Sequence, residues 1–328
     1  MTGNKTVLCE MAFLEKFWEC YPASTPFSDD KIQRKLKTWI EFYAFLSRSN
    51  KHMDCTPQSY AQVAQKNEVL ASLWKKSTEG VSKLDFSGGI DNIETHLTDN
   101  PFSVLLSGTG KGPIAKKYGI INVNGGNCLT KEHLFIDNGK AIRMDEIWDW
   151  KQFEKCFPER SSNSMIIVDN YVLKNGRRDL PELLKLLLPE SCEVDYHLTI
   201  FYFPEVGMSL TKEDIIDMIR NTKPDLINSL QLELIPMISK TDFHDRAIIT
   251  NNLWFSSGAG FDLTRWDSSS RSNVAKRSTT LEIVYPYFAS NNIGKVDTAY
   301  ENLIKDAKVA LEHAKMSSNN RLIGDLTV

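Results

Sequence analysis

The stretch from residue 164 to residue 236 alternates apolar runs with amphipathic segments, and this alternation constrains the fold more than any other feature. The runs SMIIVDNYVL, HLTIFYF and LQLELIPM are rich in β-branched and aromatic residues, which favour strands. DLPELLKLLLP and TKEDIIDMIRNT lie between them and have helical spacing, and Pro181 and Pro189 bound the first of these helices. Strands that alternate with helices form a sheet whose faces the helices cover. We therefore expect an α/β fold with a mixed sheet flanked by helices.

A separate N-terminal α/β domain is predicted for residues 1–140. TVLC at 6–9 has the composition of a strand, and MAFLEKFWEC after it has that of a helix. From residue 101 the chain runs through FSVLLS, GTGKGP, IAKKYG and IINVNGG, which predicts strand, glycine loop, short helix and strand. The polar, glycine-containing stretch FIDNGKAIRMDE at 135–146 marks the boundary, so the second domain covers residues 141–328. A chain of 328 residues is long enough for two domains of ordinary size.

Two longer helices are predicted within the N-terminal domain. One covers residues 28–47 and the other residues 57–76. The first has apolar residues at spacings of three and four, which are expected to face the core: Ile32, Leu36, Trp39, Ile40, Tyr43 and Leu46. The last part of the chain also has helical spacing, over residues 297–316, on Leu303, Ala307, Ala310, Leu311 and Ala314.

Composition limits the kinds of protein this chain can be. The net charge is -3 with a pI near 6.1, so no overall positive field attracts a polyanion and any phosphate binding must be local. Six cysteines are scattered without a CxxC pair, which predicts neither a zinc site nor a disulfide framework. No apolar stretch approaches a signal peptide or a transmembrane helix. We expect a cytoplasmic protein without metal or cofactor.

The most informative stretch for function is TDFHDRAIITNNLWFSSGAGFDL, residues 241–263. On a strand, His244 and Arg246 point to the same side of the sheet. A guanidinium offers a planar fork of donors to a phosphate, and an imidazole can attack phosphorus or transfer a proton. His244 and Arg246 are therefore candidate catalytic residues, and Gly258 in the following turn is a candidate phosphate-binding residue. The alternative is a surface pair on a sheet edge, with Asp245 or Asp262 as a salt-bridge partner.

This stretch resembles the HxK motif region of phospholipase-D-like proteins, in which a strand, a turn and a strand carry the motif. The closer resemblance is to the phospholipase-D-like C-terminal domain of MIT-domain proteins and its bacterial relatives. It covers residues 145–290 and depends on FHDR at 243–246, on GAGFD at 258–262, and on Asp169 and Tyr171, which match the relatives' D-P-Y with Asn170 in place of the Pro. The correspondence to the HxK motif is partial: His244 and Gly258 match, whereas Arg246 replaces Lys, Asn251 replaces Asp, Ala259 replaces Ser and Phe261 replaces Asn.

The resemblance to the catalytic family implies a phosphodiesterase or nuclease that works without a metal ion, whereas the MIT-type relatives are regarded as non-catalytic and lipid- or partner-binding. In the catalytic family, one histidine forms a phosphohistidine and a histidine from a second motif is the general acid. This chain supplies one such motif, so catalysis requires a homodimer that brings two His244 side chains together. Arg246 and Asn251 complete the predicted catalytic set. We expect the protein to bind a nucleic acid and, if the site is catalytic, to cleave it. The expected setting is a bacterial defence or toxin-like system. The alternative is a non-catalytic module that docks on lipid headgroups or on a protein partner.

A basic stretch follows the motif at residues 265–280, with the sequence RWDSSSRSNVAKRSTT. Its four cations are candidate phosphate-binding residues: Arg265, Arg271, Lys276 and Arg277. A flexible loop of this composition could close over a polyanion and supply the charge that the whole chain lacks. A solvated surface loop is the alternative.

Two weaker patterns occur in the N-terminal domain. SGTGKGP at 107–113 lies between a strand and a helix, but Gly112 and Pro113 stand where a P-loop has its hydroxyl residue. The domain also faintly resembles the PIN-like nuclease fold, which implies a metal site with Glu10, Asp85 or Asp91 as ligands. Capping and surface roles are the alternative for these carboxylates.

Overall fold

The computed structural model divides the chain into two compact units. Unit 1 contains residues 1–137 and 285–296, and unit 2 contains residues 138–284 and 297–328. The residues that the structure describes are 6–22, 30–65, 67–74, 77–78, 90–101, 103–135, 140–143, 154–175, 178–204, 209–238, 246–258, 260–261, 263–269, 271–275, 280–286, 288 and 293–324.

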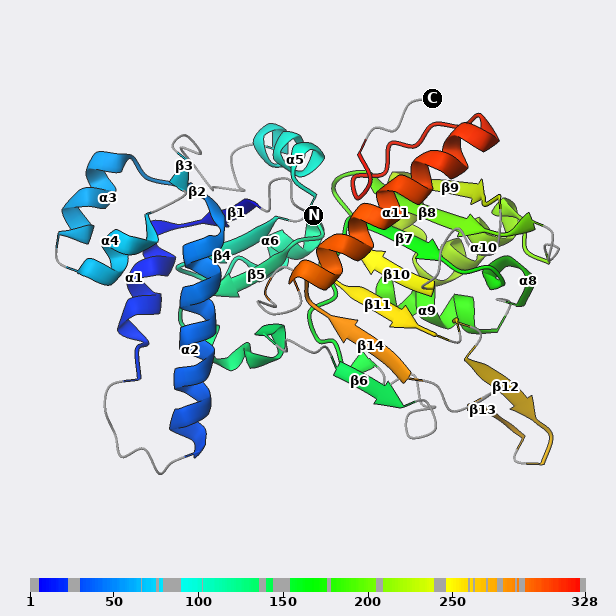
Figure 1. The fold of residues 1–328 in the computed structure, drawn as a ribbon, viewed down its shortest axis with the longest axis horizontal. Coiled ribbons are helices and arrows are strands. Elements are labelled where there is room, and N and C mark those ends of the chain that lie inside the picture. The colour runs from blue at the N-terminus through cyan, green and yellow to red at the C-terminus, as the bar shows by residue number, and fades with distance from the viewer. Residues whose placement is uncertain are drawn as a thin grey trace. The chain divides into compact units, whose positions relative to one another are not determined.

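Unit 1 is built on a parallel sheet of five strands (Figure 1). The strands lie in the order β3-β2-β1-β4-β5, and their bounds are Thr6–Cys9 (β1), Asn50–Met53 (β2), Ser77–Thr78 (β3), Val104–Ser107 (β4) and Ile121–Asn124 (β5). Because β2 and β4 flank β1 on opposite sides, the chain changes direction between β1 and β4. This is the topological switch point of a doubly wound sheet, where ligands bind beyond the carboxyl ends of the strands.

The helices of unit 1 connect its parallel strands. They are α1 (Met11–Glu19), α2 (Asp30–Arg48), α3 (Pro57–Ala64), α4 (Glu68–Leu73), α5 (Ile90–Asp99) and α6 (Gly112–Lys117), followed by the 3-10 turns η1 (Cys128–Thr130) and η2 (Glu132–Phe135). The aromatic side chains Phe42 and Phe45 of α2 are completely buried and pack against Phe288, which groups with this unit. Burial of these rings, at roughly 1.5–3 kcal/mol each, holds α2 on the core.

Unit 2 contains a mixed sheet of seven strands in the order β6-β14-β11-β10-β7-β8-β9. The strands are β6 (Lys140–Arg143), β7 (Ser164–Val168), β8 (Tyr196–Tyr202), β9 (Leu230–Pro236), β10 (Arg246–Thr250), β11 (Trp254–Ser257) and β14 (Thr280–Val284). β7, β8 and β9 are parallel, whereas β10, β11, β14 and β6 continue the sheet with antiparallel pairings. Every residue of β7 is buried, as expected for a central strand covered on both faces.

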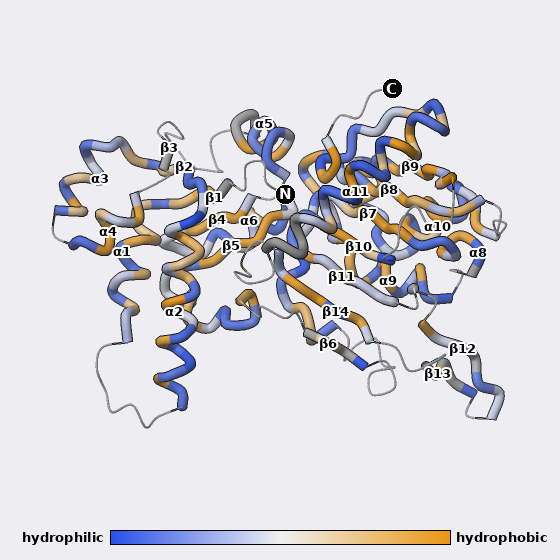
Figure 2. Tube along the Cα trace, viewed as in Figure 1, coloured by the Kyte–Doolittle hydropathy of each residue, from blue (hydrophilic) through white to orange (hydrophobic). Residues whose placement is uncertain are grey.

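The helices of unit 2 are α8 (Val172–Asn175), α9 (Asp179–Leu187), α10 (Lys212–Thr222), the 3-10 helix η4 (Pro224–Ser229) and α11 (Ile293–Ala314), whose first four residues group with unit 1. A two-stranded sheet of β12 (Thr264–Asp267) and β13 (Ser272–Ala275) follows β11. Central strands of both sheets, among them β4, β7 and β10, are predominantly hydrophobic (Figure 2). Among the described helices, none has the length and hydropathy needed to cross a bilayer.

The α/β architecture with a mixed sheet flanked by helices is confirmed, but three local predictions differ from the structure. The helix predicted for 57–76 is two helices, because Asn67 caps a new helix by accepting hydrogen bonds from the N–H groups of Val69 and Leu70. The predicted basic loop at 265–280 contains the hairpin β12–β13. On α2, Ile40 was expected to face the core but is exposed, whereas Phe42 and Phe45 are buried.

Candidate functional site

The three motifs quoted above converge at one end of the sheet of unit 2. β7 and β10 are antiparallel neighbours with Val168 opposite Ala247. Asp169 follows the last residue of β7 and Arg246 is the first residue of β10, so the two lie at the same edge of the sheet. Gly260, from the turn after β11, lies against both of them. We call Asp169, Tyr171, Arg246 and Gly260 the β7–β10 site.

Asp169 fixes the backbone of this site. Its carboxylate is buried, with 3% of the residue exposed. One oxygen accepts a hydrogen bond from the N–H of Tyr171 at 2.7 Å, and the other accepts one from the N–H of Phe261 at 2.8 Å. Buried carboxylates require such partners, because an unpaired charge in the interior is costly. Asp169 therefore joins the end of β7 to the turn after β11.

Gly260 allows the close approach of these segments. Its φ angle is +82°, a conformation that L side chains rarely adopt. A Cβ atom added there would lie 2.6 Å from a carboxylate oxygen of Asp169 and 3.0 Å from Cδ of Arg246. Both distances are shorter than ordinary van der Waals contact, and the φ angle disfavours any L side chain, so this position requires glycine for two separate reasons.

Arg246 is the cation of the site. Its side chain is half-buried, and its guanidinium carbon lies 5.5 Å from the centre of the Tyr171 ring. A cation over an aromatic face is attracted by the ring quadrupole, which orients the guanidinium. Within the described part of the chain, this guanidinium has no hydrogen bond and no ion pair. Its N–H donors are therefore not used by any described residue, and Asp245 and Asp262, the alternative salt-bridge partners, lie outside the described residues.

Asp179 holds the chain on the other side of Gly260. This residue is the first of α9 and is completely buried. One carboxylate oxygen accepts hydrogen bonds from the N–H groups of Leu263 and Thr264 at 2.7 and 3.0 Å, and the other accepts one from the Thr264 hydroxyl at 2.5 Å. Asp169 and Asp179 together anchor Phe261, Leu263 and Thr264 to the rest of unit 2.

Asn251, a predicted catalytic residue, is not brought together with Arg246. Arg246 is the first residue of β10 and Asn251 follows its last residue, a separation of roughly 16 Å for five residue steps of a strand. Asn251 is buried, and its side-chain oxygen accepts a hydrogen bond from the N–H of Asn163 at 2.9 Å. Its amide thus ties the turn between β10 and β11 to the start of β7.

The other predicted site residues of unit 2 are more dispersed. Gly258 is exposed in the turn after β11, and Arg265 is a residue of β12. Arg271 is exposed in the turn of the β12–β13 hairpin with φ at +49°. His244, Lys276 and Arg277 lie outside the described residues. Sequence reasoning did not assign a site role to Asp169, Tyr171, Gly260 or Asp179, although the first three belong to the quoted motifs.

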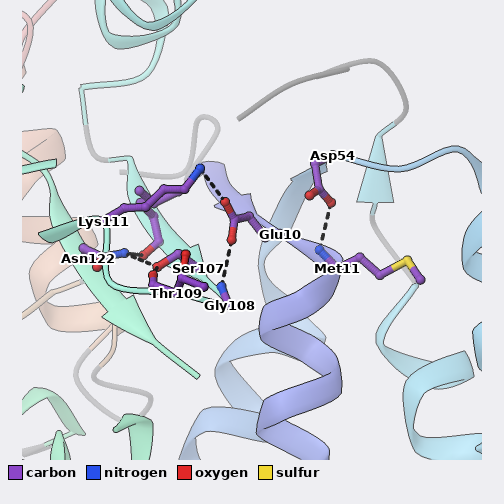
Figure 3. Close-up of polar contacts among 9 residues, drawn as sticks. Glu10, Met11, Asp54, Ser107, Gly108, Thr109, Lys111 and Asn122 are labelled. Carbon is purple, nitrogen blue, oxygen red and sulfur yellow. Dashed lines mark hydrogen bonds and ion pairs between the residues drawn. The ribbon is translucent and has the colours of Figure 1, made fainter. Parts of the chain in front are cut away.

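A second polar group lies at the carboxyl edge of the unit 1 sheet (Figure 3). One oxygen of Glu10 accepts a hydrogen bond from the N–H of Gly108 at 2.8 Å, and the other pairs with the ammonium of Lys111 at 2.8 Å. Glu10 follows β1 and Gly108 follows β4, so this group bridges the switch point of the doubly wound sheet. Lys111 belongs to the predicted glycine loop, and its ammonium therefore forms an ion pair with a carboxylate.

Asp54 lies at the same edge, after β2. Its carboxylate accepts a hydrogen bond from the N–H of Met11 at 2.8 Å, at the start of α1. Burial raises the pKa of Asp54; the Met11 hydrogen bond opposes this shift and the charge of Glu10 adds to it. Among the described residues, no group of three His, Cys, Asp or Glu side chains could hold a metal ion. Asp85 and the side chain of Asp91, the other predicted ligands, are outside the described part.

No protein-family model matches this chain, and no curated protein matches it. Functional inference therefore depends on the geometry of the two edges described above.

Proposed function

We propose that unit 2 binds the phosphate groups of a phosphodiester polymer, in particular a nucleic acid, at the β7–β10 site. The observation that carries this proposal is the guanidinium of Arg246, which is oriented by Tyr171 and has no protein partner among the described residues. A buried or half-buried arginine normally has its donors satisfied, and a free planar fork matches the oxygens of a phosphate. The resemblance of FHDR, GAGFD and the Asp169–Tyr171 segment to phospholipase-D-like proteins supports the same ligand.

The surroundings of Arg246 are compatible with an anion although Asp169 is near. Two backbone N–H groups donate to the carboxylate of Asp169, which offsets part of its negative charge. Tyr171 presents an aromatic ring at the same place and could contact a base or sugar of the polymer. Binding at this site therefore combines one charge-assisted contact with one apolar contact.

Cleavage is the stronger form of the proposal. The imidazole of His244 attacks phosphorus, the bond from phosphorus to the leaving oxygen breaks, and the His244 of a second protomer gives that oxygen a proton. Water then attacks the phosphorus and gives a proton to the second protomer's His244, and the phosphorus–nitrogen bond breaks to release the second product. This chemistry needs a two-fold dimer but no metal ion. A protein that light scattering shows to be monomeric at micromolar concentration would exclude it and leave binding alone.

Replacement of Arg246 by alanine tests binding. We expect Arg246→Ala to weaken binding of labelled single-stranded RNA or DNA by about tenfold to a hundredfold, because one charge-assisted phosphate contact is lost. Fluorescence anisotropy at low and moderate salt measures this. Arg220→Ala is the matched control, since Arg220 is exposed and pairs with Asp217 on α10. Equal affinity of both variants would contradict the proposal, and binding of phosphoinositide vesicles without nucleic acid binding would favour the lipid alternative.

Replacement of His244 by alanine tests cleavage. His244→Ala should abolish release of labelled fragments while Arg246 still retains the polymer, and the activity of the unaltered protein should survive EDTA. Arg246→Lys restores the usual HxK pair and should preserve turnover, while weakening any binding that depends on the planar fork. EDTA-sensitive cleavage that persists in His244→Ala would instead assign the chemistry to the carboxylates of unit 1.

A further inference from the structure

Unit 1 has a pair of neighbouring aromatic rings that are exposed. Trp18 and Tyr21, at the end of α1, are 37% and 45% exposed. A few large hydrophobic residues are exposed in the described part of the chain, and these two are the aromatic ones among them. Their rings are stacked, with centres 6.2 Å apart and planes 14° from parallel. Exposed neighbouring rings of this kind are typical of contact surfaces.

The exposed rings are held in place by buried ones. Tyr21 packs against the ring of Trp39 with centres 4.9 Å apart and planes at 79°. Trp39 is 7% exposed, stacks on buried Phe17 at 4.9 Å, and donates a hydrogen bond to the Phe17 carbonyl. The outer rings therefore continue an aromatic cluster of the core. Tyr21 is thus oriented by Trp39 before any ligand arrives and Trp18 stacks on Tyr21, so little side-chain entropy is lost on binding.

Cations lie on α2 beside this aromatic pair. The first eight residues of α2, Asp30–Lys37, contain four cations and one anion, although the whole chain has a net charge of -3. Lys31, Lys35 and Trp39 follow one another at intervals of four residues, which places them in one row along the helix. Figure 2 shows this end of α2 as mainly hydrophilic.

Arg34, Lys35 and Lys37 in this segment are exposed and have no ion pair with any described residue. The nearby anions are Glu15 and Glu19 on α1 and Glu41 on α2, so the positive charge is concentrated on the first turns of α2. Ile40 is also exposed, but it follows Trp39 directly and thus lies about 100° around the helix from the row. Arg34 lies about 100° from the row in the opposite direction, in line with the buried Thr38.

We infer that this α1–α2 surface, formed by Trp18, Tyr21, Arg34 and Lys35, binds single-stranded nucleic acid. Every base has a flat face that stacks on an aromatic ring without regard to sequence, and cations beside the rings neutralise the phosphates. Parallel aromatic rings beside lysines and arginines favour this ligand over an acidic helix, which would dock on an aliphatic stripe. The inference takes the class of ligand from the function proposed for unit 2 but uses separate residues, so the two can fail separately.

The test is binding of the full-length chain to labelled oligo(dT) and oligo(U), with a duplex of equal length for comparison. We expect the double variant W18A/Y21A to weaken single-strand binding by about tenfold to a hundredfold and to leave duplex binding unchanged, because paired bases cannot stack on the rings. Tryptophan fluorescence of the unaltered protein should be quenched on addition of oligo(dT), and W18A/Y21A should lose this quenching. Ile40→Ala is the control for an exposed apolar residue on α2 and should bind as the unaltered protein does.

A second variant, R34Q/K35Q, tests the cations. Its plot of log affinity against log salt should be shallower by about 1.4, the loss expected for two phosphate contacts with a single strand. Circular dichroism before and after heating checks that each variant is folded. Unchanged oligo(dT) affinity in folded W18A/Y21A would overturn the inference, as would binding of anionic vesicles or an acidic peptide in place of the oligonucleotide. An effect of W18A/Y21A with none of Arg246→Ala would refute the function proposed for unit 2 and leave this inference standing.

Discussion

Gly260→Ala is expected to abolish phosphate binding by unit 2 and to lower its free energy of unfolding by about 2–5 kcal/mol. A new Cβ would lie 2.6 Å from Asp169 and 3.0 Å from Arg246, so it must displace the carboxylate or the arginine that forms the site. The φ angle of +82° adds the cost of a left-handed backbone at a residue that is no longer glycine. Calorimetry and oligonucleotide anisotropy measure the two effects.

Gly258→Ala is the matched control, two residues away in the same turn. Gly258 is exposed, its φ angle is not positive, and an added Cβ would meet nothing within 4 Å. We expect its unfolding free energy to change by less than about 0.5 kcal/mol. If Gly260→Ala and Gly258→Ala have the same free energy of unfolding and the same oligonucleotide affinity, the close packing of Asp169, Arg246 and Gly260 does not determine the structure of the site.

Local patterns in the sequence predicted most of the elements, because strand and helix periodicity depends on neighbouring residues. The strands at 6–9, 164–168 and 196–202 are examples. The break between α3 and α4 was missed because it depends on one capping side chain, Asn67, inside an otherwise helical pattern. The buried face of α2 was only partly predicted. Apolar residues occupy much of its circumference, so periodicity did not reveal that Phe42 and Phe45 pack on the core while Ile40 remains in solvent.

The site was predictable in its parts but not in its assembly. Arg246 was identified from its type and its place on a strand, and the order of the motifs was visible in the sequence. The meeting of Asp169 with Gly260 depends on β7 lying beside β10, a pairing between strands far apart in the chain. Asn251 was placed with Arg246 by motif spacing, yet spacing along a single strand puts them at opposite ends. Asp179 belongs to no short motif, because its partners at 263 and 264 are distant in sequence.

Asp179→Ala is expected to lower the free energy of unfolding of unit 2 by about 3 kcal/mol or more, since it leaves buried donors without an acceptor. The affected donors are the N–H groups of Leu263 and Thr264 and the Thr264 hydroxyl, all of which now bind a completely buried carboxylate.

Asp179→Asn should cost less, because its amide oxygen still accepts from the two N–H groups while the hydroxyl can rotate to accept from the amide nitrogen. Asp217→Asn is the control: that carboxylate is exposed on α10 beside Arg220 and should contribute less than about 1 kcal/mol. Because Asp179 and Asp169 anchor the two ends of residues 260–264, the Ala variant should also weaken oligonucleotide binding at Arg246, measured where the variant is still folded. Unfolding of Asp179→Ala at the same temperature as Asp217→Asn would show that this segment is held by apolar packing and not by its carboxylate anchors.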